Sequence, residues 1–189
     1  FAFFHRRGNH MATQAKQILT PVGRLVSSSL YIPEDKDYDG QPLVYNDGTP
    51  RVEYSAGIAI AKVAGQHWAS TPWGAIIWAA GHEGWPQGQG NAPTFSWKVY
   101  DGDSQIPNKN NKRNCDKEGW PGHWVLFFST GTQPKMCNAD GSQLLMEPNA
   151  IKPGYFVQIA GSVKDNNPAK SPGVYLNLNA VALAGYGPE

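Results

Sequence analysis

Strand-length apolar segments recur from one end of the chain to the other, and loops rich in glycine and proline separate them. The 189 residues include 21 glycines and 15 prolines, well above the usual shares of about 7% and 5%. Within residues 51–62, apolar side chains from Val52 to Ile60 occupy every second position, a period that indicates a strand buried on one face. Comparable segments bring the expected number of strands to six or seven; they lie at residues 23–32, 94–100, 122–129, 134–138, 155–163 and 173–184.

Residues 71–80 form the one segment with helical periodicity. Thr71 is placed to cap the N-terminus of this helix, Pro72 suits its first turn, and Gly81 is expected to end it. Four apolar residues then fall on one stripe, at i, i+3, i+4 and i+7: Trp73, Ile76, Ile77 and Ala80. Many short strands, long loops and one helix predict a mainly β protein, built as a small barrel or a sandwich.

The length is typical of one domain, and we expect that domain to span residues 11–189. Residues 1–10 read as a vector-derived remnant, because Met11 looks like a start codon retained behind a tag. The polar residues 11–20 are expected to be frayed. No run of 18 apolar residues occurs, so the sequence predicts no membrane-spanning segment.

The charge of the chain is close to balanced. The formal net charge is +1, and without Arg6 and Arg7 it becomes slightly negative. This excludes a uniformly polybasic protein, so a site for a polyanion must depend on local clustering of cations. The two cysteines, Cys115 and Cys137, are too few for a four-ligand zinc site. We expect them to be free thiols in a reducing cytosol.

Positive charge does cluster in one polar loop, between Ile106 and Trp120, and aromatic residues flank this loop on both sides. Single-stranded nucleic acid is bound by cations that follow its phosphates and by aromatic rings that stack on its unpaired bases. The alternative is a solvated loop beside aromatic core residues. The cations of the loop are Lys109, Lys112, Arg113 and Lys117, and the flanking rings include Tyr100, Trp120 and Trp124.

The alternation of side chains within each strand indicates which groups lie outside the sheet. In residues 173–179, for example, Tyr175 and Asn177 lie opposite the apolar face. For each aromatic ring, packing in the core or at its rim is the alternative. Applied to all strands of a barrel, this reasoning predicts one outer concave surface made of Lys98, Tyr100, Trp124, Gln158, Tyr175 and Asn177.

No constellation of catalytic residues stands out. Asp101 and Asp103 would suit a metal-dependent nuclease, but the residues that follow them do not match a calcium loop. A turn that ends a strand is the simpler interpretation. Neither the G-x-S-x-G nor the GxxxxGK[ST] motif occurs. We therefore expect a protein that is not an enzyme and that needs no cofactor and no metal.

Four blocks of the sequence form a distinctive set: KVYDGD at residues 98–103, GWPGHW at 119–124 after the basic loop, KPGYFV at 152–157 and PGVYLNLN at 172–179. Together they resemble the bacteriophage single-stranded-DNA-binding proteins with an OB-fold, over most of residues 20–187. The resemblance implies a five-stranded barrel with additional strands, one short helix and long loops, which holds single-stranded DNA without strong sequence preference. The binding positions that it implies are Lys98, Tyr100, Lys112, Arg113, Trp120, Trp124 and Tyr175.

The expected function is therefore to bind and protect single-stranded DNA during DNA replication or recombination, in the cytoplasm of the infected bacterial host. A carbohydrate-binding module is an alternative, because exposed tryptophan and tyrosine also stack on sugar rings. The nuclease and a purely structural phage component are further alternatives. Replication-type single-strand binders usually end in an acidic tail that recruits replication proteins, whereas this sequence ends in GYGPE. Either such a tail is missing here or partners are recruited differently.

Overall fold

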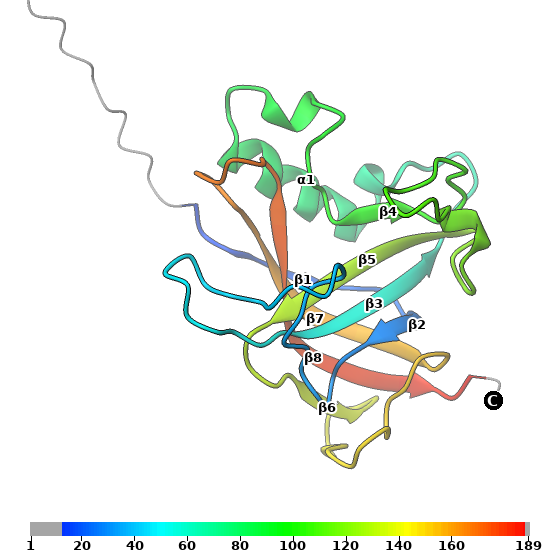
Figure 1. The fold of residues 1–189 in the computed structure, drawn as a ribbon. Coiled ribbons are helices and arrows are strands. Elements are labelled where there is room, and N and C mark those ends of the chain that lie inside the picture. The colour runs from blue at the N-terminus through cyan, green and yellow to red at the C-terminus, as the bar shows by residue number, and fades with distance from the viewer. Residues whose placement is uncertain (1–12, 188–189) are drawn as a thin grey trace, which may run out of the picture.

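In the computed structural model, which describes residues 13–187, five strands close into a barrel (Figure 1). Their spatial order is β2 (Gly23–Ser28), β3 (Tyr54–Ala61), β5 (His123–Thr130), β8 (Val174–Gly185) and β7 (Phe156–Asp165), which pairs again with β2. β5 and β8 are parallel, and the other neighbours are antiparallel. This arrangement is that of the OB-fold, so the predicted fold class is confirmed.

Three shorter strands extend the barrel at its edges. β1 (Lys16–Leu19) pairs with β7, β4 (Val99–Asp101) pairs with β5, and β6 (Lys135–Asn138) pairs with β8. The prediction that residues 11–20 are frayed is wrong for β1, because Ile18 is only 3% exposed and anchors this strand in the core, while residues 11 and 12 lie outside the described residues. The segment at residues 1–10, predicted to be a vector remnant, lies outside the described residues.

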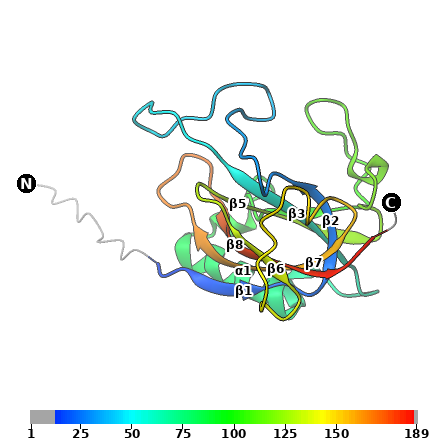
Figure 2. The ribbon, with the colours of Figure 1, turned by 90° about the horizontal axis from the view of Figure 1, so that it is seen from below.

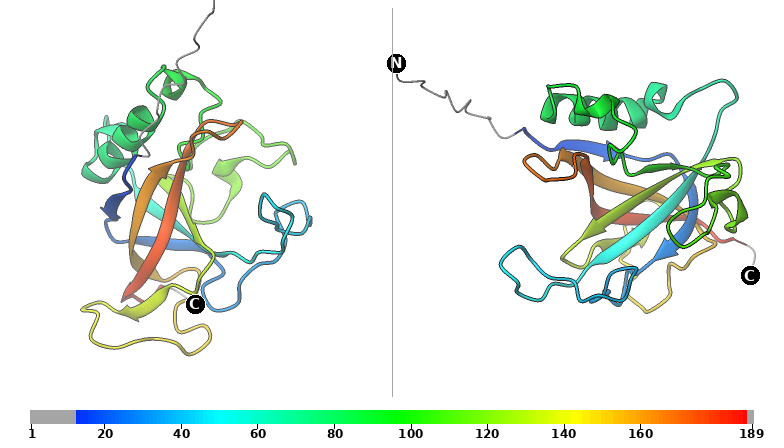
Figure 3. Two further views of the ribbon diagram at one scale, coloured as in Figure 1. Left: turned by 90° about the vertical axis from the view of Figure 1, so that its left-hand side faces the viewer. Right: turned by 45° about the horizontal axis from the view of Figure 1, so that its top comes forward.

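Helix α1 (Pro72–Gly84) covers the barrel on the side opposite the long loop between β2 and β3 (Figure 3). The predicted cap is confirmed, since Oγ1 of Thr71 accepts a hydrogen bond of 3.0 Å from the backbone of the third helical residue. The prediction that Gly81 ends the helix is wrong. Gly81 lies inside the helix, which continues to Gly84. The residue is a glycine because the Trp97 ring packs against it, and a Cβ there would come within 2.3 Å of that ring. Three short 3-10 turns complete the helical segments: Trp68–Ser70, Gln89–Asn91 and Asn114–Asp116.

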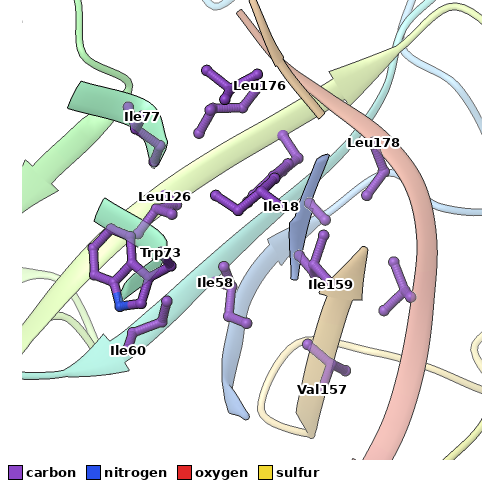
Figure 4. Close-up of a cluster of buried hydrophobic side chains, with 14 of the residues drawn as sticks. Ile18, Ile58, Ile60, Trp73, Ile77, Leu126, Val157, Ile159, Leu176 and Leu178 are labelled. Atoms are coloured by element: carbon purple, nitrogen blue, oxygen red, sulfur yellow. The ribbon is translucent and has the colours of Figure 1, made fainter. Parts of the chain in front are cut away.

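The core fills the barrel and continues beneath α1 (Figure 4). Alternate residues of the barrel strands point inward, as the period-two pattern predicts. On β5 the inward face carries Leu126 and Phe128, neither of which is exposed to solvent. Phe127 therefore lies on the outer face of β5. Labelled side chains in Figure 4 that line this interior are Ile58, Ile60, Leu126, Val157, Ile159, Leu176 and Leu178, with Trp73 and Ile77 of the helix.

Two further predictions concern the whole chain. Cys115 and Cys137 are both free thiols, as expected. Among residues 13–187, α1 and the shorter helical turns all fall short of the length and apolar character that a membrane-spanning helix needs.

Candidate nucleic-acid interface

Two long loops stand on the same side of the barrel (Figure 2). We call residues 29–53 the β2–β3 loop and residues 102–122 the β4–β5 loop. Beside the β2–β3 loop lies an open hollow of about 710 Å³, which we call the central groove. Phe127 and Ser129 of β5 and Tyr175 of β8 are part of its lining, together with residues of the β2–β3 loop. This is the face of the barrel, on its second and third strands and beside its first long loop, that OB-folds use to bind oligonucleotides.

Two adjoining hollows lengthen the central groove. The first, the side pocket of about 760 Å³, lies against the β4–β5 loop and shares Tyr38, Tyr100 and Phe127 with the central groove. The second, the end pocket of about 410 Å³, shares Arg51 and Tyr175 with it. Because neighbouring hollows have walls in common, the three form one continuous surface, which we call the binding groove.

Tyrosine rings are exposed along the whole binding groove. Tyr38, Tyr100 and Tyr175 are 68%, 39% and 58% exposed. Tyr100 is held edge-on against Phe127, with 5.7 Å between the ring centroids and an interplanar angle of 81°. Burial raises the pKa of Tyr100 above its ordinary value. These flat, uncharged rings can stack on unpaired bases.

Three predicted cations line the binding groove without an ion-pair partner among the described residues. They are Lys98, beside Tyr100 in the central groove, and Lys112 and Lys117, in the side pocket. Nζ of Lys117 lies 3.9 Å from the centroid of the Trp120 ring. Burial lowers the pKa of Lys117, and the nearby charge of Lys112 acts in the same direction.

The other two predicted cations are already neutralised by acidic groups. The Arg113 guanidinium donates two hydrogen bonds, of 2.7 and 2.9 Å, to the carboxylate of Asp116. Lys109 forms an ion pair with Asp39 of the β2–β3 loop. This ion pair joins the outer parts of the two loops, so Lys109 contributes to the shape of the binding groove more directly than to its charge.

Lys98 has an unusual backbone conformation for a lysine. Its φ angle is +59°, in the left-handed region that glycine tolerates best. Such a residue stores strain of the order of 1 kcal/mol, and the surrounding structure must hold it in place. Here the carbonyl oxygen of Lys98 accepts a hydrogen bond of 3.4 Å from the backbone of Phe127. The strained position is therefore part of the lining of the central groove, which also includes Tyr100 and Phe127.

The base of the β4–β5 loop is fixed by the two carboxylates that suggested a nuclease. The Lys62 ammonium forms ion pairs with both Asp101 and Asp103, the latter at 2.6 Å. This hydrogen bond from Lys62, with a second from the backbone of Gly122, lowers the pKa of Asp103. Gly102 between them lies so close to the backbone of Trp120 that a Cβ would approach its carbonyl oxygen to 1.9 Å. The KVYDGD block therefore holds the base of the β4–β5 loop in position through these contacts.

Besides Lys109 and Arg113, which line none of the three hollows, the structure separates two further predicted residues from the binding groove. Trp124 lies on the inward-facing side of β5 and packs against the core, with Nζ of Lys62 at 4.4 Å from its ring and His67 against its edge. Gln158 of β7 donates its side-chain amide to the carbonyl of Thr20, at 2.8 Å. The prediction of one outer surface is wrong for both, because Trp124 was assigned to the wrong face of β5 and Gln158 lies where β7 meets β1.

The structure brings the other seven predicted residues together. Lys98, Tyr100 and Tyr175 line the central groove, and Lys112, Lys117 and Trp120 line the side pocket. Trp120 is only 7% exposed and forms the back of that pocket against Phe127. Asn177 lines the end pocket, on a strand that pairs with β5 at Ser129.

Two parts of the binding groove escaped the sequence analysis. The first is Phe127, which forms its floor. The second is the β2–β3 loop, which reads as an acidic turn but contributes Tyr38, Tyr45 and Arg51 to the walls. The signal was present, because this loop combines tyrosines with cations, much as the β4–β5 loop combines Trp120 with cations. The loop also carries Glu34, Asp37 and Glu53, so the central groove is nearly neutral overall.

No known protein-family profile matches the chain, and no curated protein sequence is significantly similar to it. Solved structures are similar in fold. The single-stranded DNA-binding protein from bacteriophage Enc34 in complex with ssDNA superposes with a TM-score of 0.58 and 18% identity, covering 91% of this chain and 88% of that one. For gp2.5, a single-stranded DNA-binding protein encoded by bacteriophage T7, the TM-score is 0.50 and the identity 16%, with 92% and 94% covered. Over about nine-tenths of its length, this chain therefore has the fold of phage single-stranded-DNA-binding proteins, as the sequence blocks predicted.

Proposed function

We propose that this protein binds single-stranded DNA in the binding groove, without strong sequence preference, and protects it during phage DNA replication or recombination in the host cytoplasm. The observation that carries the proposal is the continuous groove, which combines exposed tyrosine rings with lysines that have no acidic partner within residues 13–187. Rings stack on any base, and ammonium groups contact phosphates whatever the sequence. The structures of similar fold, which are named as single-stranded DNA-binding proteins, support the same conclusion.

The groove favours a single strand over a duplex. In duplex DNA the faces of the bases are stacked on one another, so the tyrosine rings would have no partner. The chain is also close to electrical balance, so it lacks the broad positive surface that attracts duplex DNA through its phosphates alone. Stacking therefore supplies the preference for unpaired bases.

We propose that binding involves no catalysed reaction. Asp101 and Asp103, which would serve a metal-dependent nuclease, are both engaged by the Lys62 ammonium. A metal ion would have to displace this cation from both carboxylates. Incubation of labelled DNA with the protein and magnesium or manganese should leave the DNA intact, and the appearance of cleavage products would contradict this part of the proposal.

The test of the proposed function is a titration of fluorescently labelled oligo-dT at several salt concentrations, followed by anisotropy. We expect saturable binding that weakens with salt, at a slope of log K against log salt of about −0.7 for each phosphate contacted. A duplex of equal length should bind much more weakly. Equal affinity for the duplex, or salt-independent binding of a glycan in place of DNA, would overturn the proposal.

Replacement of Lys98 by alanine should remove one phosphate contact. We expect the salt slope of oligo-dT binding to decrease by about 0.7, with weaker binding at low salt. Lys98→Gly removes the same charge but fits the positive φ angle, so it should bind like Lys98→Ala while unfolding at a higher temperature. Lys135→Ala is the matched control, because Lys135 is exposed on β6, away from the groove lining. A slope reduced equally by Lys135→Ala would argue against a contact specific to Lys98.

A further inference from the structure

We infer that the side pocket is an anchoring site for one unstacked nucleotide of the bound strand, with the base among the aromatic walls and its phosphate at Lys112 and Lys117. The inference rests on the proposed function and adds to it: one position along the strand would contribute more to affinity than its neighbours. Three observations carry it, namely the charge of the pocket, the arrangement of its rings and the origin of its walls.

The charge of the side pocket differs from that of the rest of the binding groove. Its lining contains Lys112 and Lys117 and no carboxylate. The central groove, by contrast, includes Glu34, Asp37 and Glu53 in its lining. An incoming phosphate therefore meets two ammonium groups in the side pocket, without the repulsion that carboxylates exert elsewhere in the groove. Lys112 is exposed and carries no ion pair among residues 13–187, so it is available to such a phosphate.

The rings of the side pocket surround a space and do not form a flat platform. The Tyr100 ring is nearly perpendicular to Phe127, at 81°, and the Trp120 ring is inclined to Phe127 by 44°. A continuous stack of bases requires parallel faces, whereas these rings pack against one another at an angle and form a corner that one flat group can occupy. The volume of about 760 Å³ lies within the range of sites that hold small organic ligands. Ile106 and Pro107 supply the apolar rim.

The walls of the side pocket come from both long loops. The β4–β5 loop supplies most of the lining, and Tyr38 reaches in from the β2–β3 loop. A side-chain hydrogen bond with Asn110 and the charge of Lys112, both in the β4–β5 loop, lower the pKa of Tyr38. The ion pair between Lys109 and Asp39 holds the two loops together beside this point. The pocket is thus complete in the free protein, as an anchoring site requires.

Burial and the nearby charge of Lys112 disfavour the charged form of Lys117, and a bound anion would favour it. Its Nζ lies over the Trp120 ring and donates a hydrogen bond of 3.0 Å to Asn114. The neighbouring charge of Lys112 disfavours the charged form of Lys117. A phosphate placed between the two lysines would relieve this repulsion. Trp120, at the back of the pocket, would report the event through its fluorescence.

The test uses the shortest oligo-dT that saturates one chain, with a single abasic site moved along it one position at a time. For the wild-type protein we expect one position at which loss of the base weakens binding by about 5- to 150-fold, the loss of one stacked base. Other positions should show clearly smaller effects. Tyr38→Ala should remove the sensitivity to this one position, because Tyr38 belongs to the pocket and is too exposed to affect folding.

Tyr45→Ala is the matched control, since Tyr45 is 55% exposed on the same loop but lines the end pocket. This variant should keep the sensitive position. A flat profile for the wild-type protein, with oligo-dT still bound, would overturn the inference and leave the proposed function standing. A sensitive position that survives in Tyr38→Ala would also place the anchor elsewhere. If no oligonucleotide binds at all, the proposed function fails and the inference fails with it.

Discussion

Replacing Tyr100 and Tyr175 together by leucine should weaken the binding of oligo-dT by about 100-fold at constant salt. Both rings are exposed in the central groove, and Tyr175 is 58% accessible. Loss of one ring that stacks on a base costs about 1–3 kcal/mol when alanine replaces it. Leucine retains some apolar contact, so we expect about 1.5 kcal/mol for each position and about 3 kcal/mol for both, which is close to two factors of ten in Kd.

Three features of the expected result identify stacking as the cause. The salt slope should stay that of the wild-type protein, because neither ring carries a charge. The melting temperature should change little, since leucine preserves the contact of position 100 with Phe127. Tyr186→Leu should bind normally, because Tyr186 is 74% exposed outside the groove lining. An equal loss of affinity in Tyr186→Leu, or a loss below threefold in the double variant, would contradict the proposed site.

The strands could be predicted from the sequence because their side-chain pattern is local. In residues 51–62 the larger apolar side chains alternate well, and β3 (Tyr54–Ala61) lies within this segment. The first short strand could not be found this way. Lys16 and Gln17 make its segment look polar, and a single residue, Ile18, carries its burial. Its pairing with β7 depends on residues nearly 150 positions further along the chain. A contact so distant in sequence leaves no local pattern.

For β5, the sequence did not show which face points inward, and the reason is different. Both are apolar: Leu126 and Phe128 lie on one, and Val125 and Phe127 on the other. Alternation tells which residues share a face, but when both faces are apolar it does not tell which one points inward. Val125 on the outer face is itself fully buried, beneath Trp120. The β4–β5 loop thus covers part of the outer face of β5. A prediction that assumes one buried and one exposed face for each strand does not account for such a cover.

The sequence predicted the type of binding site, but not which of its cations are available to DNA. Cations between aromatic strands indicated a site for unpaired nucleic acid, and Lys98, Tyr100, Lys112 and Tyr175 do line one groove. The sequence could not show that Asp116 neutralises Arg113 or that Asp39 neutralises Lys109. The partner of Lys109 comes from the opposite loop, about 70 residues away. Counting charges within one loop therefore overestimated the charge available to DNA.

The assignment of Trp124 to the core leads to the second prediction. Trp124→Ala should lower the free energy of unfolding by about 3 kcal/mol, the lower end of the range for large aromatic residues in cores, because this side chain is partly accessible. For a protein of this size the melting temperature should fall by about 6–12 °C. The loss comprises the packing against the core and the interaction of the ring with the Lys62 ammonium.

The affinity of the folded variant for oligo-dT should stay within about twofold of the wild-type value, because the Trp124 ring lies outside the groove lining and Phe127 takes the outer position on β5. Binding should be measured well below the lowered melting temperature, so that unfolded protein does not imitate weak affinity. Trp124→Phe provides the matched control: it keeps an aromatic ring in the core and should recover most of the stability. The opposite pattern, a large loss of affinity with an unchanged melting temperature, would mean that Trp124 stacks on DNA and that β5 presents its other face to the groove.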